Sequence, residues 1–202
     1  LTYPDGEEVV YTYDSGGQVS QVEGRQRYVT RLEYDEFGQR ALLALGNGVD
    51  TRYTYDPAMR RLERLLSAPL DMPAFQDLSY GYTLSGNIRS LVNNVSPPLT
   101  GFGGRVDQSF TYDDLYRLET ASGTFNGRND SHRYDLTMAY DALHNIESKT
   151  QLHTTLGNGP PKTQGKTSYD WTYSYGSTRP HAPTQIGERE LSYDLNGNLT
   201  GW

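Results

Sequence analysis

The chain of 202 residues contains no cysteine, so it can form neither a disulfide framework nor a thiolate metal site. No apolar run approaches the roughly 20 residues that a membrane helix needs, and no signal-peptide pattern is present. Hydrophobic residues make up only 35% of the chain, and its mean hydropathy is −0.74. The sequence therefore predicts no membrane span and only a thin buried layer.

Basic residues are also scarce, since 18 Lys and Arg stand against 25 Asp and Glu and give a net charge of −7. This balance disfavours nucleic-acid binding through bulk electrostatics. The densest basic spot, Arg60-Arg61 with Arg64, is interrupted by Glu63 and is interpreted as a solvated strand face. We therefore expect no nucleic-acid partner.

Tyrosine is abundant instead, with 17 residues, and many of these belong to one recurring phrase. In this phrase an aromatic or apolar residue, a spacer, Tyr and Asp precede a turn. Its copies carry Tyr13-Asp14, Tyr34-Asp35, Tyr55-Asp56, Tyr112-Asp113, Tyr140-Asp141 and Tyr193-Asp194, and weaker copies lie at Tyr82-Thr83 and at 171–176. The first three aspartates are 21 residues apart. Self-similarity at a period of about 20–50 residues indicates a repeat architecture.

Each copy predicts a β-hairpin whose turn follows the Tyr-Asp pair. Tyr11 and Tyr13 point to one face of a strand, and Asp14 can accept backbone N–H groups to start the turn. Asp in the first and Gly in the fourth position is the type I preference. The fourth position holds Gly17, Gly38, Gly86 and Gly197, and we expect Met59, Tyr116 and His144 to replace Gly there without any special φ.

The return strand of each hairpin shows a second regularity, two residues after the fourth turn position. That place is apolar in most copies and is predicted to face the core: Val19, Ile88, Leu118, Ile146 and Leu199. Arg40 and Arg61 break the rule, with Ala41 and Leu62 one place later, so a slip of register is expected at both.

About eight hairpins would give about sixteen strands, and open twisted sheets rarely exceed about ten strands without curling. The sequence therefore predicts an all-β fold of tandem hairpins in a long, strongly curved antiparallel sheet, either a spiral or a shell segment. Residues 1–202 form one such array, expected to be a piece of a larger protein because its sheet edges would be unpaired. The Gly- and Pro-rich stretches 93–107, 121–133 and 153–168 are predicted to be long loops.

The phrase Tyr-x-Tyr-Asp-x-x-Gly-x-Leu/Val, repeated at about 20 residues, resembles the YD repeat of Rhs (rearrangement hotspot) proteins. The stretches 45–56, 112–118, 179–182 and 193–200 resemble the repeat region of bacterial Rhs and insecticidal toxin-complex B/C proteins. The resemblance covers nearly the whole chain. It implies a hairpin strip that spirals into a hollow shell around a C-terminal toxin, in a secreted or cell-surface protein. The partners implied are the remainder of the same polypeptide and the encapsulated toxin domain.

No catalytic, cofactor or metal site is expected. The aspartates occupy one repeated turn slot, which favours a structural role over paired-carboxylate hydrolysis. The calcium-like spacing 194–198 lacks the required Gly placement and is interpreted as a turn. The four histidines lack metal-ligand spacing; His144 occupies a turn, and His132 and His153 are expected in loops.

Two alternatives to a structural wall remain open at this point. Rows of exposed tyrosines could make the chain a cell-surface carbohydrate- or receptor-binding β module. The opposing interpretation is that these rings pack as cross-strand pairs. A hydrolase that uses the turn carboxylates is the third hypothesis.

Overall fold

The computed structural model describes residues 1–96, 104–128, 130–157, 159–176 and 178–202, and every helix or strand within them is a β-strand. The first nine strands are β1 (Val10–Tyr13), β2 (Val19–Glu23), β3 (Arg27–Tyr34), β4 (Arg40–Leu45), β5 (Val49–Tyr55), β6 (Leu62–Pro69), β7 (Gln76–Tyr82), β8 (Ile88–Asn93) and β9 (Arg105–Tyr112). The others are β10 (Leu118–Asn126), β11 (Ser131–Tyr140), β12 (Ile146–Leu156), β13 (Lys162–Thr163), β14 (Tyr169–Tyr175), β15 (Pro183–Ile186), β16 (Arg189–Glu190), β17 (Ser192–Tyr193) and β18 (Leu199–Gly201).

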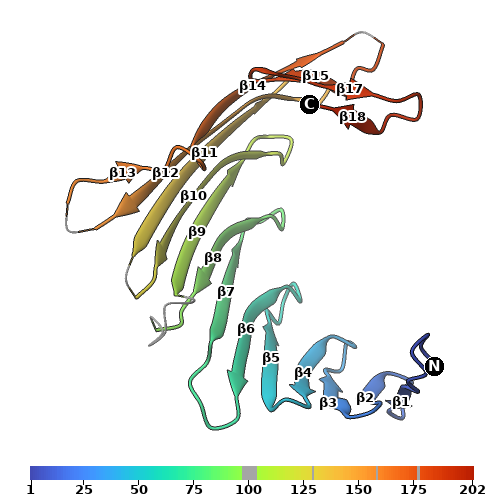
Figure 1. The fold of residues 1–202 in the computed structure, drawn as a ribbon. Coiled ribbons are helices and arrows are strands. Elements are labelled where there is room, and N and C mark those ends of the chain that lie inside the picture. Colours follow the sequence, from blue (N-terminus) through green and yellow to red (C-terminus); the bar gives the residue numbers. More distant parts are fainter. Residues whose placement is uncertain (97–103, 129, 158, 177) are drawn as a thin grey trace.

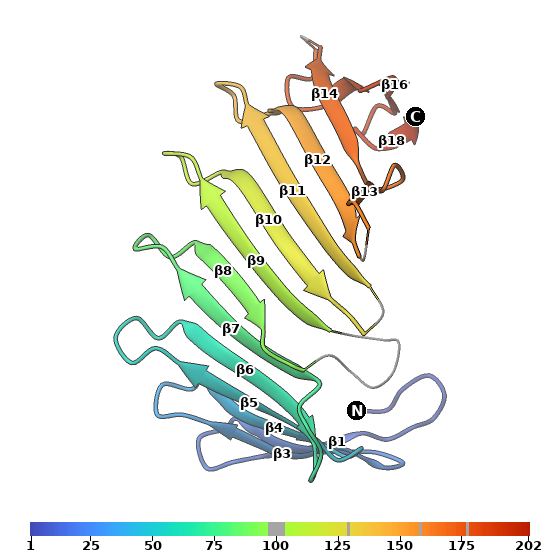
Figure 2. The same cartoon turned by 90° about the vertical axis from the view of Figure 1, so that its left-hand side faces the viewer.

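Sixteen strands form one antiparallel sheet in sequential order, from β1 through β12 to β14, β15 and β16, with β13 attached beside β12. A separate two-stranded sheet joins β17 to β18. The large sheet bends into an open arc, and the two chain ends lie at opposite ends of this arc (Figure 1). Seen from the side, the hairpins follow one another as successive rungs (Figure 2). The predicted all-β, strongly curved antiparallel sheet is confirmed.

The two faces of the sheet differ in chemistry. Along β9 the side chains of Val106, Gln108, Phe110 and Tyr112 are half-buried, and the residues between them are exposed. We call the face that carries the repeat tyrosines the ring face. The opposite face is more polar and carries ion pairs such as Arg64–Asp77, in which Nε and Oδ1 are 2.7 Å apart, although Leu42 and Ala44 are buried on it. This alternation is the signature of strands with one apolar side.

The core is thin, as the composition predicts. Among the described residues the buried apolar side chains are Val9, Leu42, Ala44, Val95 and Ala121, and no large side chain is fully buried. Within the described residues the large sheet is a single curved layer, and besides it there is only the short β17–β18 sheet and no helix. The half-buried rings of the ring face therefore take the place of an ordinary core.

Of the three predicted loops, 121–133 is wrong and 153–168 is only partly right. Most of 121–133 belongs to β10 and β11, and 153–168 contains the end of β12 together with β13. Gly123 was predicted to be a loop residue, but it lies inside β10. Glycine is needed there because an added Cβ would come within 2.5 Å of the Tyr134 ring. A strand glycine can thus mark the close approach of a neighbouring ring. The third loop joins β8 to β9, and the part of it at 97–103 lies outside the described residues.

Candidate functional site

The turn after each Tyr-Asp pair is built around the carboxylate. Asp14 Oδ1 accepts hydrogen bonds from the backbone N–H groups of Gly16, at 2.8 Å, and Gln18, at 2.9 Å. The backbone N–H of Gly17 donates to the Asp14 carbonyl at 3.1 Å, which closes the turn. The same pair of hydrogen bonds to Oδ1 recurs at Asp35, Asp113, Asp141 and Asp194. In the weaker copy, the Thr83 hydroxyl accepts from the Asn87 N–H at 3.1 Å.

The fourth turn position is left-handed in six copies, which corrects the expectation that it needs no special φ. The φ values are 78° at Gly17, 76° at Gly38, 98° at Gly86 and 85° at Gly197, and they stay positive at Tyr116 (62°) and His144 (67°). The turns are therefore type I turns followed by a left-handed residue, a common three-residue hairpin loop. A bulky residue in this conformation carries a backbone cost that Gly avoids.

The Asp56 turn is one residue longer than the others, so Met59 does not hold the left-handed position. Arg60 holds it instead, with φ 57°, and its N–H donates to the Asp56 carbonyl at 2.9 Å. Tyr55 consequently pairs with Leu62, which confirms the register slip expected at Arg61. The slip expected at Arg40 does not occur, because Arg40 pairs with Tyr34 as Val19 pairs with Tyr13. The Arg40 guanidinium lies 5.7 Å from the centre of the Tyr53 ring.

The tyrosines make a second, unexpected series of hydrogen bonds. Each repeat tyrosine from the second copy onward donates its hydroxyl to a backbone carbonyl of the preceding hairpin. We call these seven bonds the tyrosine ladder: Tyr34 to Val19 (3.1 Å), Tyr55 to Arg40 (3.0 Å), Tyr82 to Leu62 (2.7 Å), Tyr112 to Ile88 (2.7 Å), Tyr140 to Leu118 (2.9 Å), Tyr175 to Ile146 (3.0 Å) and Tyr193 to Pro183 (2.9 Å). Each accepting residue is the cross-strand partner of the previous tyrosine in the ladder or, for Val19, of Tyr13.

The ladder lies where backbone pairing between hairpins ends. Between β8 and β9 the last pair on the turn side is Ser90 with Ser109. A register shift in each hairpin next to its tyrosine bends the strands there, as bulges do. The hydroxyl of Tyr112 spans the resulting gap and reaches the Ile88 carbonyl. The ladder therefore couples neighbouring hairpins where the sheet itself does not.

Two predictions from the sequence were incomplete at the ends of this series. Tyr175 belongs to the ladder although no Asp follows it, and the weak copy at 171–176 was its only signal in the sequence. Leu199 pairs with Tyr193 but is 50% exposed, so its predicted place in the core is wrong. Tyr13 opens the series, is 58% exposed and makes no ladder bond within the described part of the chain.

The turns are also linked to one another through the residue after the left-handed position. We call these links the turn row. Gln39 Nε2 donates to the Arg60 carbonyl at 2.8 Å, and an Arg61 guanidinium nitrogen donates to the Thr83 carbonyl at 3.0 Å. Asn145 Nδ2 donates to the Pro180 carbonyl at 2.9 Å. Asn87 holds the equivalent position, yet its buried Nδ2 has no partner among the described residues.

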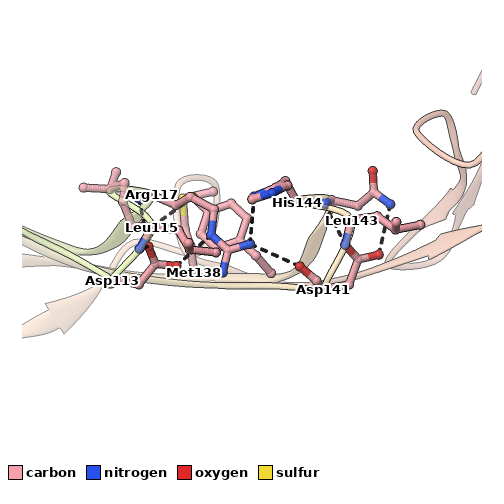
Figure 3. Close-up of polar contacts among 10 residues, drawn as sticks. Asp113, Leu115, Arg117, Met138, Asp141, Leu143 and His144 are labelled. Carbon is pink, nitrogen blue, oxygen red and sulfur yellow. Dashed lines mark hydrogen bonds and ion pairs between the residues drawn. The ribbon is translucent and has the colours of Figure 1, made fainter.

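Arg117 is the best-connected member of the turn row (Figure 3). Its Nε donates to Asp113 Oδ2 at 2.7 Å, and its terminal nitrogen donates to the Asp141 carbonyl at 3.1 Å. The same nitrogen lies 3.3 Å from His144 Nδ1, and the guanidinium lies 4.7 Å from the centre of the Tyr140 ring. One side chain thus joins two turns and one ladder tyrosine.

Hydrogen bonding shifts the turn carboxylates. Partial burial of Asp113 tends to raise its pKa, but the backbone and side chain of Arg117 outweigh this and hold the pKa below its usual value. The pKa of Asp141 is lowered against the same burial effect by the side-chain and backbone N–H groups of Asn145. The Asn198 side chain is the main cause of the lowered pKa of Asp194. These acids are held ionised as turn acceptors.

The remaining features concern membrane spans, metal sites and the histidines. Within the described ranges no helix is long and apolar enough to cross a membrane. No group of three or more His, Cys, Asp or Glu residues there is placed to hold a metal ion. The expectation that His132 and His153 lie in loops is wrong, because they lie on β11 and β12.

Comparison with known proteins gives the class of protein to which this array is similar. No family model matches the chain. It is 32% identical over 131 residues to Toxin subunit YenC2 of Yersinia entomophaga, which covers 58% of this chain and 14% of that protein. It is 32% identical over 108 residues to Toxin subunit YenC1 of the same organism, covering 48% of this chain and 11% of that protein. The chain thus matches about one seventh of these relatives or less.

Solved structures share the fold. The Photorhabdus luminescens Tc holotoxin pore with the TccC3-D651A mutation aligns with a TM-score of 0.74 and 22% identity, over 98% of this chain and 11% of that one. The TcdB2-TccC3-Cdc42 structure aligns with a TM-score of 0.73 and 21% identity, over 96% of this chain and 11% of that one. Together with the sequence relatives, these matches confirm the resemblance to the repeat region of Rhs and insecticidal toxin-complex proteins.

Proposed function

We propose that this chain is a non-enzymatic wall segment of a YD-repeat shell that encapsulates a C-terminal toxin or effector of the same polypeptide. The observation that carries the proposal is the tyrosine ladder in an open, curved, single-layered sheet. A ladder that couples each hairpin only to the preceding one can be extended without limit, as a wall requires. On this proposal residues 1–202 are one array within a larger secreted protein.

The two-faced sheet supports the same proposal. A shell needs one side toward its contents and one toward water, and here an aromatic face lies opposite a charged one. The relatives add a toxin context, since both sequence relatives are toxin subunits and one structural match is a Tc holotoxin pore. The partners proposed are the remainder of the polypeptide and the toxin domain inside it.

The rim formed by the turns also suits a larger assembly. Several turns carry an exposed large apolar side chain at the tip: Phe37 (63% exposed), Leu84 (101%), Leu115 (59%), Leu143 (57%) and Leu195 (99%). An apolar residue at one tip after another is unusual for a free rim, because contiguous apolar surface favours association. We assign this rim to contact with the next winding of the same shell.

Limited proteolysis of the full polypeptide that carries this segment tests the proposal. In the wild type the C-terminal region should resist protease while it is enclosed. Combined Tyr82→Phe, Tyr112→Phe and Tyr140→Phe substitutions should loosen the wall and expose that region, whereas Tyr53→Phe, on the same face but outside the ladder, should not. A C-terminal region that is cleaved in the wild type as fast as the isolated domain would contradict encapsulation.

A carbohydrate- or receptor-binding role stays a prediction, and one observation favours a place for it. On β14 the rings of Tyr169 and Trp171 stack at 4.1 Å with planes 16° apart, and Lys149 lies 5.5 Å from the Tyr169 ring centre. Ladder tyrosines have their hydroxyls engaged, so this pair is the better candidate. Glycan-array binding that is lost in Trp171→Ala would promote this function, and an array without signal would end it.

A further inference from the structure

Two histidines meet on the ring face of β11 and β12. Tyr134 pairs with His153, and His132 pairs with Thr155, so the two histidines are diagonal neighbours on adjacent strands. Their rings are 5.1 Å apart and tilted by 48°. His132 Nδ1 and His153 Nε2 are hydrogen-bonded to each other at 3.1 Å. The geometry thus brings two ring nitrogens to one point.

The outward nitrogens of both rings have oxygen partners. His132 Nε2 lies 3.0 Å from Asp130 Oδ2, and His153 Nδ1 lies 2.5 Å from the Thr167 hydroxyl. An ionised carboxylate only accepts hydrogen bonds, so His132 Nε2 carries its hydrogen and Nδ1 presents a lone pair to His153. The Thr167 hydroxyl has a second acceptor in the Gln164 carbonyl, at 3.4 Å. It can therefore accept a hydrogen from His153 Nδ1. In the hydrogen-bonded pair His153 Nε2 carries the hydrogen, and moving this hydrogen to Nδ1 breaks the bond to His132 and frees the Nε2 lone pair.

We propose that the His132 and His153 imidazoles together bind a divalent late first-row transition ion, represented here by Zn²⁺. Zinc–nitrogen bonds are about 2.0–2.1 Å long, so two ligands at an angle of about 95–110° lie about 3.0–3.4 Å apart. The observed separation of 3.1 Å falls in this range. Each imidazole donates one electron pair, and a shift of the His153 hydrogen to Nδ1 makes this possible without releasing a proton.

The surroundings fit such a site. Metal-binding histidines almost always donate their other N–H to a carboxylate or another oxygen, as Asp130 and Thr167 allow here. Both histidines line a cavity of about 340 Å³ whose wall also contains Gln108 and Gln151. Water or a ligand from a bound partner can complete the coordination from this space. With two imidazoles as its protein ligands, the site is an open, exchangeable one that prefers zinc, nickel or copper to magnesium or calcium.

Isothermal titration of the 202-residue chain with zinc chloride and nickel chloride tests the site. We expect one equivalent to bind, and magnesium chloride to give no heat. His132→Ala and His153→Ala should each abolish zinc binding. His144→Asn is the matched control, because it removes a turn histidine from a left-handed position that Asn tolerates, and should leave binding unchanged.

Asp130→Asn tests the contact between the Asp130 carboxylate and His132 Nε2. We expect zinc affinity to fall about 10–100-fold with the circular dichroism spectrum unchanged. In the wild-type protein, zinc should also shift the nitrogen NMR signals of His132 Nδ1 and His153 Nε2, which reads the site without any substitution. Absence of zinc and nickel binding would overturn the proposal. Binding that survives both histidine-to-alanine changes, or NMR signals that do not move, would overturn it as well.

Discussion

Replacing Tyr112 with Phe removes one rung of the tyrosine ladder and leaves the ring in place. The lost contact is the 2.7 Å hydrogen bond from the Tyr112 hydroxyl to the Ile88 carbonyl, beyond the last backbone pair of β8 and β9. A hydrogen bond contributes a net 0.5–1.5 kcal/mol, and Ile88 is half-buried, so its carbonyl is only partly rehydrated. We expect Tyr112→Phe to lower the free energy of unfolding by about 1 kcal/mol. For a chain of about 200 residues this lowers Tm by about 2–4 °C.

Urea denaturation followed by circular dichroism measures this change, and Tyr13→Phe is the matched control. Tyr13 occupies the same place in its hairpin but is 58% exposed and makes no ladder bond within the described residues. Its substitution should change the unfolding free energy by less than about 0.5 kcal/mol. Equal losses in the two variants, or no loss in Tyr112→Phe, would refute the idea that the ladder couples hairpins.

Three further outcomes follow from the turns. Asn87→Arg should stabilise the chain, because Arg61 and Arg117 in the same turn position reach the next turn and Asn87 Nδ2 has no partner among the described residues; thermal melting measures the gain. Tyr116→Gly should raise the unfolding free energy by about 0.5–1 kcal/mol, because it relieves a left-handed residue; a loss of stability in urea would contradict this. The lowered carboxylate pKa values of Asp113 and Asp141 mean that the unfolded chain binds more protons, so the urea midpoint should fall as the pH drops from about 5 toward 2, and less steeply in Asp113→Asn.

The sequence predicts the hairpin array well because its signals are local. Asp14 and Gly17 lie within one turn, and Tyr11 and Tyr13 within one strand, so spacing alone indicates turn, strand and repeat. Sequential hairpins then dictate the strand order. The curved sheet follows from the number of strands, which exceeds what an open twisted sheet tolerates.

The ladder could not be predicted, because each hydroxyl and its acceptor belong to different repeats. Tyr55 donates to a backbone carbonyl at Arg40, and no side-chain pattern marks a carbonyl. The left-handed residues Tyr116 and His144 were also hidden, since local preference places Gly or Asn there and the rest of the hairpin overrides that preference. The longer Asp56 turn could be predicted, because the apolar residue of its return strand, Leu62, comes one place later than in most copies.

The contact between the two histidines could not be predicted from the sequence either. His132 and His153 are 21 residues apart, the spacing of the early repeats, and no short metal motif contains them. The prediction of loops at 121–133 and 153–168 separated them further. Only the pairing of β11 with β12 brings their nitrogens together.

The ladder also explains why the repeat uses tyrosine rather than phenylalanine. Both rings cover the same area of the ring face, but with few buried apolar side chains the hairpins need another source of cohesion. Seven hydroxyl bonds at about 1 kcal/mol each are comparable to the net stability of an ordinary domain, about 5–15 kcal/mol. The Asp of the pair acts mainly inside one turn, where Thr83 can replace it, although Asp35 also pairs with Arg60 of the next turn. The Tyr acts between repeats, where only a phenol has both the ring and the reach, so the tyrosine is the half of the phrase that makes an array.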